Sequence, residues 1–260
     1  MADIRIFSYL PNPRVWKSLI AAELCNVDVE VIGDKPAALG SWLWDFNAHQ
    51  LSEDERSDDS PYARKSRRGF NGTLFKTDAF LEAHPFGTVP AAFSSDGNVG
   101  VFESNSILRA VVRTSAEDHG LYGYDHQSAS RVDSFLDADL VFAREAQVYL
   151  LAADNMDQAT AERMAAAYEF FLNGLEQALT TSHYIAGDEL TIADIGICCD
   201  VFQFLRERLL ASKLASNGFT PISDDLEVQY PQVTQHLRQL STRPVFNQYL
   251  GRELQRTLGP

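Results

Sequence analysis

One run of the sequence, Phe80 to Val112, constrains the fold more than any other, because it holds a strand pair and a helix start in close succession. The apolar segments Val89–Phe93 and Val99–Phe102 flank Asp96–Asn98, which has the chemistry of a hairpin turn. The pair Glu103-Ser104 then stands where the second strand gives way to an apolar-periodic helix. A hydroxyl and free backbone N–H groups are therefore expected at a positive helix terminus, which suits a carboxylate.

Strand and helix patterns alternate through the rest of the first 116 residues. Ile4–Ser8 and Val27–Ile32 have strand patterns on either side of a helical pattern over Arg14–Leu24, which makes a βαβ unit. A helix that ends near Ala83, followed by the hairpin and its helix, completes the order βαβαββα. This order predicts a thioredoxin-like α/β domain over residues 1–116.

From residue 117 onward the pattern changes to helices only. Helices are predicted over residues 127–153, 158–179, 192–213, 231–240 and 244–254. We therefore predict an all-α helical bundle over residues 117–260. Thr191 and Asp194 stand three residues apart just before an apolar run, which predicts a reciprocal cap at the start of that helix.

Two parts of the chain resemble the glutathione transferase family: Val89-Pro90 before the hairpin with Glu103-Ser104 after it, and the segment His183–Asp200. The resemblance implies the glutathione transferase fold and glutathione as cosubstrate. It implies that Pro90 follows a cis peptide bond and that the backbone of its neighbour Val89 pairs with the cysteinyl part of glutathione. It also implies that Glu103 and Ser104 bind the γ-glutamyl end.

Glutathione chemistry needs a thiolate, which the protein stabilises by hydrogen bonds or positive potential at the start of the first helix. No cysteine lies in that segment, which disfavours mixed-disulfide chemistry. Asn12 and Arg14 are equal candidates for the catalytic, thiol-activating residue, and Tyr9 follows them. A structural role stays open for each, because Asn12 before a proline also suits a turn and a helix entry.

A long connection, residues 33–76, inserts between the second strand and the second helix, and connections of this length are usually functional or disordered. Trp42 and Trp44 within it either fasten the connection to the domain or form a wall over an aromatic substrate. At its end, the resemblance implies that Lys76 meets the glycyl carboxylate of glutathione.

The first helix of the bundle carries three further substrate-binding candidates, Phe142, Arg144 and Tyr149. In the family this helix lines the second-substrate pocket. Periodicity shows only that these residues share a helix, and core packing is the alternative for Phe142.

The net charge of -14 argues against partners such as nucleic acid or an anionic membrane, because both would repel the chain. No apolar run approaches the roughly 20 residues that span a bilayer, and the first ten residues lack a secretory-signal pattern. Cys25, Cys198 and Cys199 have no metal-ligand spacing, so no metal is expected. Together these features predict a cytoplasmic protein.

Within the family, segments such as Tyr184–Ile195 are similar to the transferase-like domain of the gamma subunit of the translation elongation factor complex. Bacterial glutathione-dependent β-etherases are another similar group. We predict a glutathione transferase that acts on an aromatic electrophile, with cleavage of a β-aryl ether as one form of that reaction. The alternative is a non-catalytic scaffold or partner subunit, either gamma-like or the silent half of a heterodimer. The resemblance implies a homodimer or a heterodimer.

Overall fold

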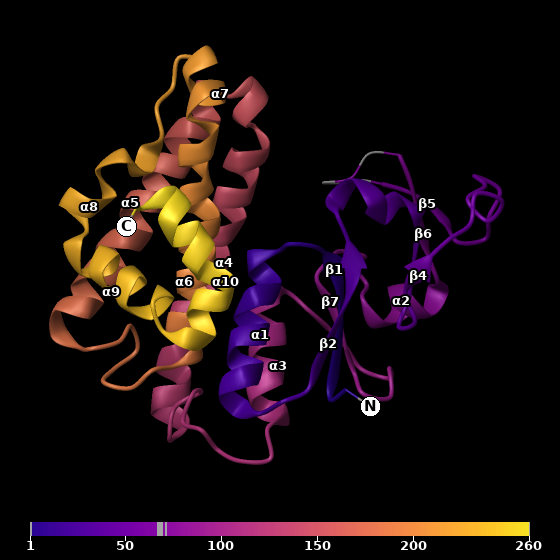
Figure 1. The fold of residues 1–260 in the computed structure, drawn as a ribbon, viewed down its shortest axis with the longest axis horizontal. Coiled ribbons are helices and arrows are strands. Elements are labelled where there is room, and N and C mark those ends of the chain that lie inside the picture. The colour runs from indigo at the N-terminus through magenta and orange to yellow at the C-terminus, as the bar shows by residue number, and fades with distance from the viewer. Residues whose placement is uncertain (1, 67–69, 71, 260) are drawn as a thin grey trace. The chain divides into compact units, whose positions relative to one another are not determined.

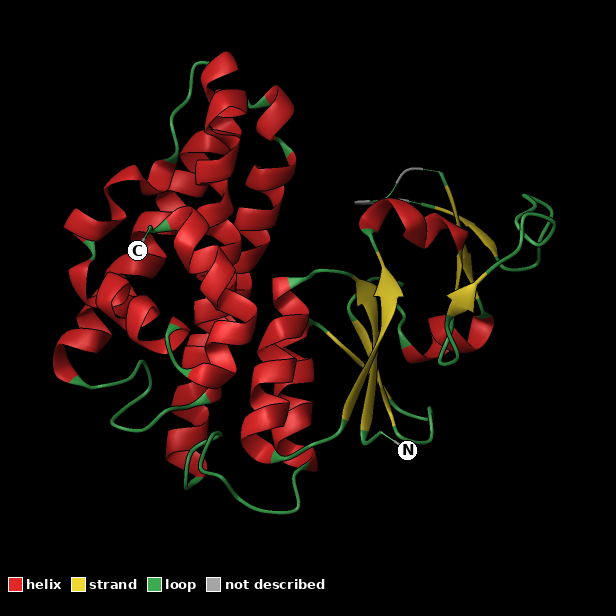
Figure 2. Ribbon diagram, viewed as in Figure 1, coloured by secondary structure: helices red, strands yellow, loops and turns green. Residues whose placement is uncertain are grey.

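The computed structural model describes residues 2–66, 70 and 72–259. The chain divides into two compact units, residues 1–116 and 117–260. The first unit is mixed α/β and the second is helical (Figures 1 and 2). This architecture confirms the predicted combination of a thioredoxin-like domain with an all-α bundle.

The N-terminal unit is built on a four-stranded sheet in the order β2-β1-β7-β8. Its strands are β1 (Ile4–Tyr9), β2 (Val29–Asp34), β7 (Ala91–Ser94) and β8 (Gly100–Phe102). β1 and β2 run parallel, whereas β7 pairs antiparallel with both β1 and β8. The helices of this unit are α1 (Pro13–Cys25), α2 (Asp78–Ala83) and α3 (Ser104–Thr114). α1 and α3 lie side by side against one face of the sheet (Figure 1).

The opposite face of the sheet carries an aromatic core, because side chains alternate between the two faces of a strand. The ring of Phe7 lies 5.5 Å from that of Trp44, and Trp44 lies 5.9 Å from Phe80. Phe80 in turn contacts Phe93 at 6.2 Å. These four side chains are each at most 2% exposed. The core therefore joins the sheet, α2 and the long connection.

The long connection folds into a second sheet, in the order β4-β3-β6-β5. Its elements are a 3-10 helix (Pro36–Ser41), β3 (Trp42–Trp44), β4 (His49–Gln50), β5 (Ala63–Lys65) and β6 (Thr73–Lys76). The indole Nε1 of Trp44 donates to the carbonyl of Leu39 at 3.1 Å, so the buried ring has its polar atom satisfied. Sequence patterns did not predict these short strands, because each is at most four residues long.

The helical unit contains α4 (His126–Leu151), α5 (Gln158–Thr181), α6 (Ile192–Leu205), α7 (Ala211–Ser216), α8 (Leu226–Gln229), α9 (Pro231–Ser241) and α10 (Pro244–Thr257). α6 is mostly apolar and almost entirely buried, as expected of a helix at the centre of a bundle. None of the helices in the described ranges is long and apolar enough to cross a membrane.

The helix predicted over residues 192–213 is interrupted after Leu205, where the chain tightens into a 3-10 turn over Arg206–Leu210 before α7 begins. Glu207 in this turn is fully buried, and its carboxylate accepts from the hydroxyl of Tyr149 and from the backbone N–H groups of Ile222 and Ser223. Burial raises the pKa of Glu207. The buried carboxylate of Glu207 therefore lies in the turn that ends α6. Hydrophobic periodicity cannot predict such a buried carboxylate.

The start of α6 carries the predicted reciprocal cap. Thr191 and Asp194 form a capping box. The Asp194 carboxylate accepts from the backbone N–H and the hydroxyl of Thr191, at 2.9 and 3.0 Å. It also accepts from the backbone N–H of Ile185 at 2.8 Å, so one buried side chain holds both the helix start and the preceding loop.

We expect Asp194→Ala to lower the free energy of unfolding by roughly 2 to 4 kcal/mol, because it leaves two buried backbone donors without an acceptor. The exposed neighbour Asp188→Ala should change it by less than about 0.5 kcal/mol. Urea unfolding of both variants measures the difference. A loss below about 1 kcal/mol for Asp194→Ala would contradict the central role of this carboxylate.

Candidate functional site

The register of the first sheet brings three chain segments to one edge. Phe7 of β1 pairs with Ala91 of β7, and Ala91 pairs with Phe102 of β8. One residue further along this ladder, the end of β1, the Val89-Pro90 segment and Glu103-Ser104 therefore lie side by side. We call Tyr9, Asn12, Val89-Pro90 and Glu103-Ser104 the cradle.

The Val89–Pro90 peptide bond in the cradle is cis, as the resemblance implies. Pro90 is buried at the start of β7, and Val89 is half-buried beside it. The sequence analysis did not anticipate a second cis bond, between Leu10 and Pro11, at the entry to α1.

Lys76, at the end of β6, reaches the same segment. Its Nζ donates to the carbonyl of Gly87 at 2.7 Å and lies 4.5 Å from the ring centre of Trp44. Burial, together with the positive charge of Arg64, lowers the pKa of Lys76 to about 8. Lys76 is mostly charged at neutral pH and is bonded to Gly87, two residues before Val89, so it can meet an anion beside the cis bond.

The start of α3 forms the other side of the cradle. Glu103 has φ 65°, a left-handed conformation uncommon for a side-chain-bearing residue, and makes no side-chain cap with the helix. Ser104 is the first residue of α3 and is 6% exposed. The N–H groups of a first helical turn have no partner within the helix, so this terminus suits a ligand carboxylate.

The sequence analysis missed a buried contact next to the cradle, between Lys17 and Asn105. The Nζ of Lys17, on α1, donates to Oδ1 of Asn105, on α3, at 2.7 Å, and both residues are buried. The contact ties the second residue of α3 to α1. The available signal was a lysine among apolar residues on the buried face of α1.

Asn12 caps α1 in this structure. Its Oδ1 accepts from the backbone N–H of Arg14 at 3.0 Å, and its Nδ2 donates to the hydroxyl of Ser8 at 3.0 Å. The residue is fully buried. One of its two amide N–H bonds is accounted for by Ser8, since Nδ2 carries two hydrogens. Thiol activation by Asn12 stays a prediction, as it does for half-buried Arg14 and Tyr9.

The comparisons with known proteins agree with this architecture. Residues 145–253 match the family model described as glutathione S-transferase, C-terminal domain. A glutathione S-transferase-like protein, LUC7 of Fusarium sp, is 26% identical over 195 residues, which cover 74% of this chain and 73% of that protein. Elongation factor 1-gamma 2 of Oryza sativa subsp. japonica is 28% identical over 251 residues, 92% of this chain but only 46% of that protein.

A solved structure extends the match to the fold of nearly the whole chain. The glutathione transferase URE2P6 from Phanerochaete chrysosporium, solved with oxidized glutathione, superposes with a TM-score of 0.65 at 15% identity, over 98% of this chain and 97% of that one. The chain therefore has the glutathione transferase fold, and its residues 145–253 resemble the C-terminal domain of that family. It spans less than half the length of the elongation factor 1-gamma relative.

The predicted substrate-binding residues lie in two kinds of environment. Trp42 is half-buried, and its ring lies 6.0 Å from that of Phe7, whereas Trp44 is in the core. On α4, Phe142 is 2% exposed and stacks on Phe171 at 4.5 Å. Trp44 and Phe142 therefore serve packing in this structure.

The other two residues on α4 contrast with each other. Arg144 is exposed, whereas Tyr149 is buried and donates its hydroxyl to Glu207 at 2.7 Å. Burial and the Glu207 carboxylate raise the pKa of the Tyr149 hydroxyl. Contact of any of these side chains with a second substrate stays a prediction.

Two hollows among the described residues are not part of the cradle. One of about 450 Å³ lies in the inserted sheet, and another of about 330 Å³ lies in the helical unit, and neither is lined by a cradle residue. Within the described ranges, no group of three or more His, Cys, Asp or Glu side chains could hold a metal ion. Register, helix termini and Lys76 therefore define the candidate site better than cavity size does.

We expect the Lys76 ammonium to titrate with a midpoint near pH 8, measured by NMR from the side-chain carbon shifts and assigned with Lys76→Arg. Arg64→Gln should raise this midpoint, because it removes the nearby positive charge. A midpoint near the ordinary lysine value of about 10.4 would show that Lys76 is not held in the buried position described here.

Proposed function

We propose that this chain is a glutathione-dependent transferase that acts on an aromatic electrophile, with cleavage of a β-aryl ether as one form of the reaction. The convergence of the Val89-Pro90 segment, the start of α3 and Lys76 at one sheet edge carries the proposal. Glutathione is an anionic tripeptide with two carboxylates, so it suits a helix N-terminus at one end and a lysine at the other. The fungal transferase of the same fold that was solved with oxidized glutathione supports this choice of ligand.

In the proposed complex, the backbone of Val89 pairs with the cysteinyl unit, and Ser104 with the N–H groups of α3 holds the γ-glutamyl carboxylate. Lys76 meets the glycyl carboxylate. Val89 and Ser104 belong to the cradle, and Lys76 is bonded to Gly87 two residues before Val89, so the proposed complex needs little rearrangement of the protein.

The proposed chemistry begins when the glutathione thiol loses its proton to water and its thiolate attacks an electrophilic carbon of the second substrate. A carbon–sulfur bond forms while the bond to a phenolate oxygen or a halide breaks, and the leaving group departs with the electron pair. The protein orients the two reactants and stabilises the thiolate. Asn12 or Arg14, at the entry to α1, supplies the hydrogen bond or charge that keeps the thiol ionised.

A non-catalytic scaffold or partner subunit is the second candidate. The similarity to elongation factor 1-gamma over 92% of this chain favours it. So do the Asn12 side-chain contacts with Ser8 and Arg14, which give this residue a structural use. The dimeric state and the cytoplasmic location stay predictions in both cases.

Turnover tests the proposed function most directly. We expect the purified chain to consume glutathione with an aryl halide or a β-aryl ether, and Asn12→Asp to reduce kcat by roughly 10- to 1000-fold, the scale of losing one oriented donor. The aspartate keeps the oxygen that caps α1 but also removes the amide donor to Ser8, so urea unfolding of the variant accompanies the assay and separates lost chemistry from lost stability. The exposed Asn155→Asp is the matched control.

Glutathione binding without turnover, alone or with a partner chain, would favour the scaffold. If the chain neither binds glutathione nor turns it over, both proposed roles are wrong. Full activity in Asn12→Asp together with its loss in Arg14→Gln would move the thiol-activating role to Arg14.

We expect Ser104→Ala to weaken glutathione affinity by roughly 1 to 3 kcal/mol, because a carboxylate then loses a buried hydrogen-bond partner. Calorimetry measures the change. Thr114→Ala, at the far end of the same helix, is the control, since its hydroxyl donates to Ala110 and lies on an exposed residue. Equal affinities for the two variants and the unsubstituted chain would take Ser104 out of the site.

A further inference from the structure

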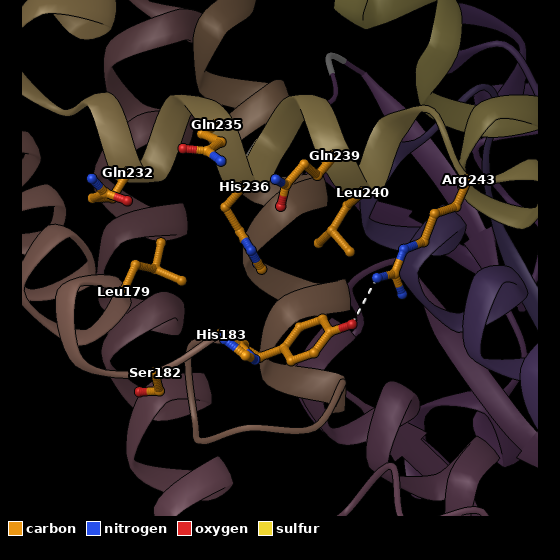
Figure 3. Close-up of a pocket in the computed structure, with 10 residues that line it drawn as sticks. Leu179, Ser182, His183, Gln232, Gln235, His236, Gln239, Leu240 and Arg243 are labelled. Carbon is orange, nitrogen blue, oxygen red and sulfur yellow. Dashed lines mark hydrogen bonds between the residues drawn. The ribbon is translucent and has the colours of Figure 1, made fainter.

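The helical unit holds a second concave site that the proposed function does not use. A hollow of about 330 Å³ opens between α9, the end of α5 and Arg243, which directly precedes α10 (Figure 3). We call it the α9 groove, and its lining residues are Leu179, Ser182, His183, Tyr184, Gln232, Gln235, His236, Gln239, Leu240 and Arg243. Its volume is at the lower end of the range of small-molecule sites.

The walls of the α9 groove are fastened to one another. The carboxylate of Glu176, on α5, accepts from the backbone N–H groups of Gln232 and Val233 at the start of α9, both at 3.0 Å. Asp194 holds the opposite wall by accepting from the backbone N–H of Ile185 at 2.8 Å. The groove is therefore formed before any ligand arrives, which lowers the entropic cost of binding.

A series of contacts from Asp194 through His236 and Tyr184 positions the Arg243 guanidinium in the groove. His236 is 6% exposed, and its Nε2 lies 3.1 Å from Oδ1 of Asp194, though without hydrogen-bond geometry. The imidazole meets the ring of Tyr184 edge to face at 6.0 Å. The Tyr184 hydroxyl accepts from Arg243 at 2.7 Å (Figure 3). The guanidinium thus has a defined place at the mouth of the groove.

The charge of the lining is positive. Arg243 contributes a permanent cation, and no Asp or Glu side chain lines the groove. A guanidinium has five N–H donors, and the one side-chain hydrogen bond that Arg243 makes within the described residues is the one to Tyr184. Its remaining donors match the two oxygens of a carboxylate.

Apolar and amide groups share the rest of the lining. Leu179 and Leu240 point into the groove, and Gln235 and Gln239 extend from successive turns of α9 (Figure 3). Tyr184 is a further lining residue. Amide side chains can donate to a carboxylate without adding charge.

We propose that the α9 groove binds a small organic anion, a carboxylate carried on an apolar ring, with the carboxylate at Arg243 and the ring against Leu179 and Tyr184. The site belongs to the helical unit and uses no residue of the cradle. It is therefore a binding site separate from the proposed catalytic one.

Titration of the full-length chain with benzoate, followed by NMR, tests the proposal, with benzyl alcohol and inorganic phosphate as comparison probes. Benzoate should shift the side-chain signals of Gln239 and Arg243. Arg243→Gln should weaken benzoate binding by at least ~10-fold, and Gln239→Glu should weaken it similarly by bringing a negative charge to the lining. Arg252→Gln and Gln255→Glu, both exposed on α10, are the matched controls and should bind as the unsubstituted chain does.

No shift with benzoate, equal binding of benzyl alcohol, or equal binding of inorganic phosphate would overturn the proposal, since each removes either the site, the charge or the apolar part. Unchanged benzoate affinity in Gln239→Glu would also overturn it. Gln239→Glu replaces only the amide of an exposed residue by a carboxylate. It therefore still tests the proposal if Arg243→Gln disturbs the start of α10.

Discussion

The antiparallel ladder that joins Phe7, Ala91 and Phe102 across three strands is the constraint on which the candidate site depends. A slip of one residue would turn every side chain of a strand to the other face. It would also move Pro90 away from the end of β1 and separate it from the start of α3. The aromatic packing of Phe7 and Phe93 holds this register, since both rings must remain in the core beside Trp44 and Phe80.

The inserted sheet links that packing to the site. Trp44 contributes to the core on which the register depends, and it also lies beneath the ammonium of Lys76. The same strand pairing that buries Trp44 places Lys76 beside it, because the two residues are partners in the parallel pair of β3 and β6. The insertion therefore contributes Trp44 to the core of the domain and places the Lys76 ammonium near the Val89-Pro90 segment.

Local patterns predicted the parts of the structure that depend on neighbouring residues. The hairpin around Gly97, the start of α3 at Ser104 and the cap formed by Thr191 and Asp194 all follow from sequence spacing of a few residues. The contact between Lys17 and Asn105 did not, because its partners stand 88 residues apart and each looks ordinary alone.

The break after α6 escaped sequence analysis for the same reason, whereas packing of Trp44 against the domain was one of the two roles that the sequence left open. Glu207 becomes an internal hydrogen-bond acceptor only once α4 and the Ile222–Asp225 turn have packed around it. For Asn12, the sequence left a catalytic and a capping role open, and the structure adds the capping contacts while the catalytic role stays a prediction.

A crystal structure of the chain with S-methylglutathione tests the central claim most directly. The account predicts a cis Val89–Pro90 bond with the Val89 backbone paired to the cysteinyl unit, and the γ-glutamyl carboxylate within hydrogen-bond distance of Ser104. A ligand bound away from the start of α3, or a γ-glutamyl carboxylate without contact to Ser104, would contradict it.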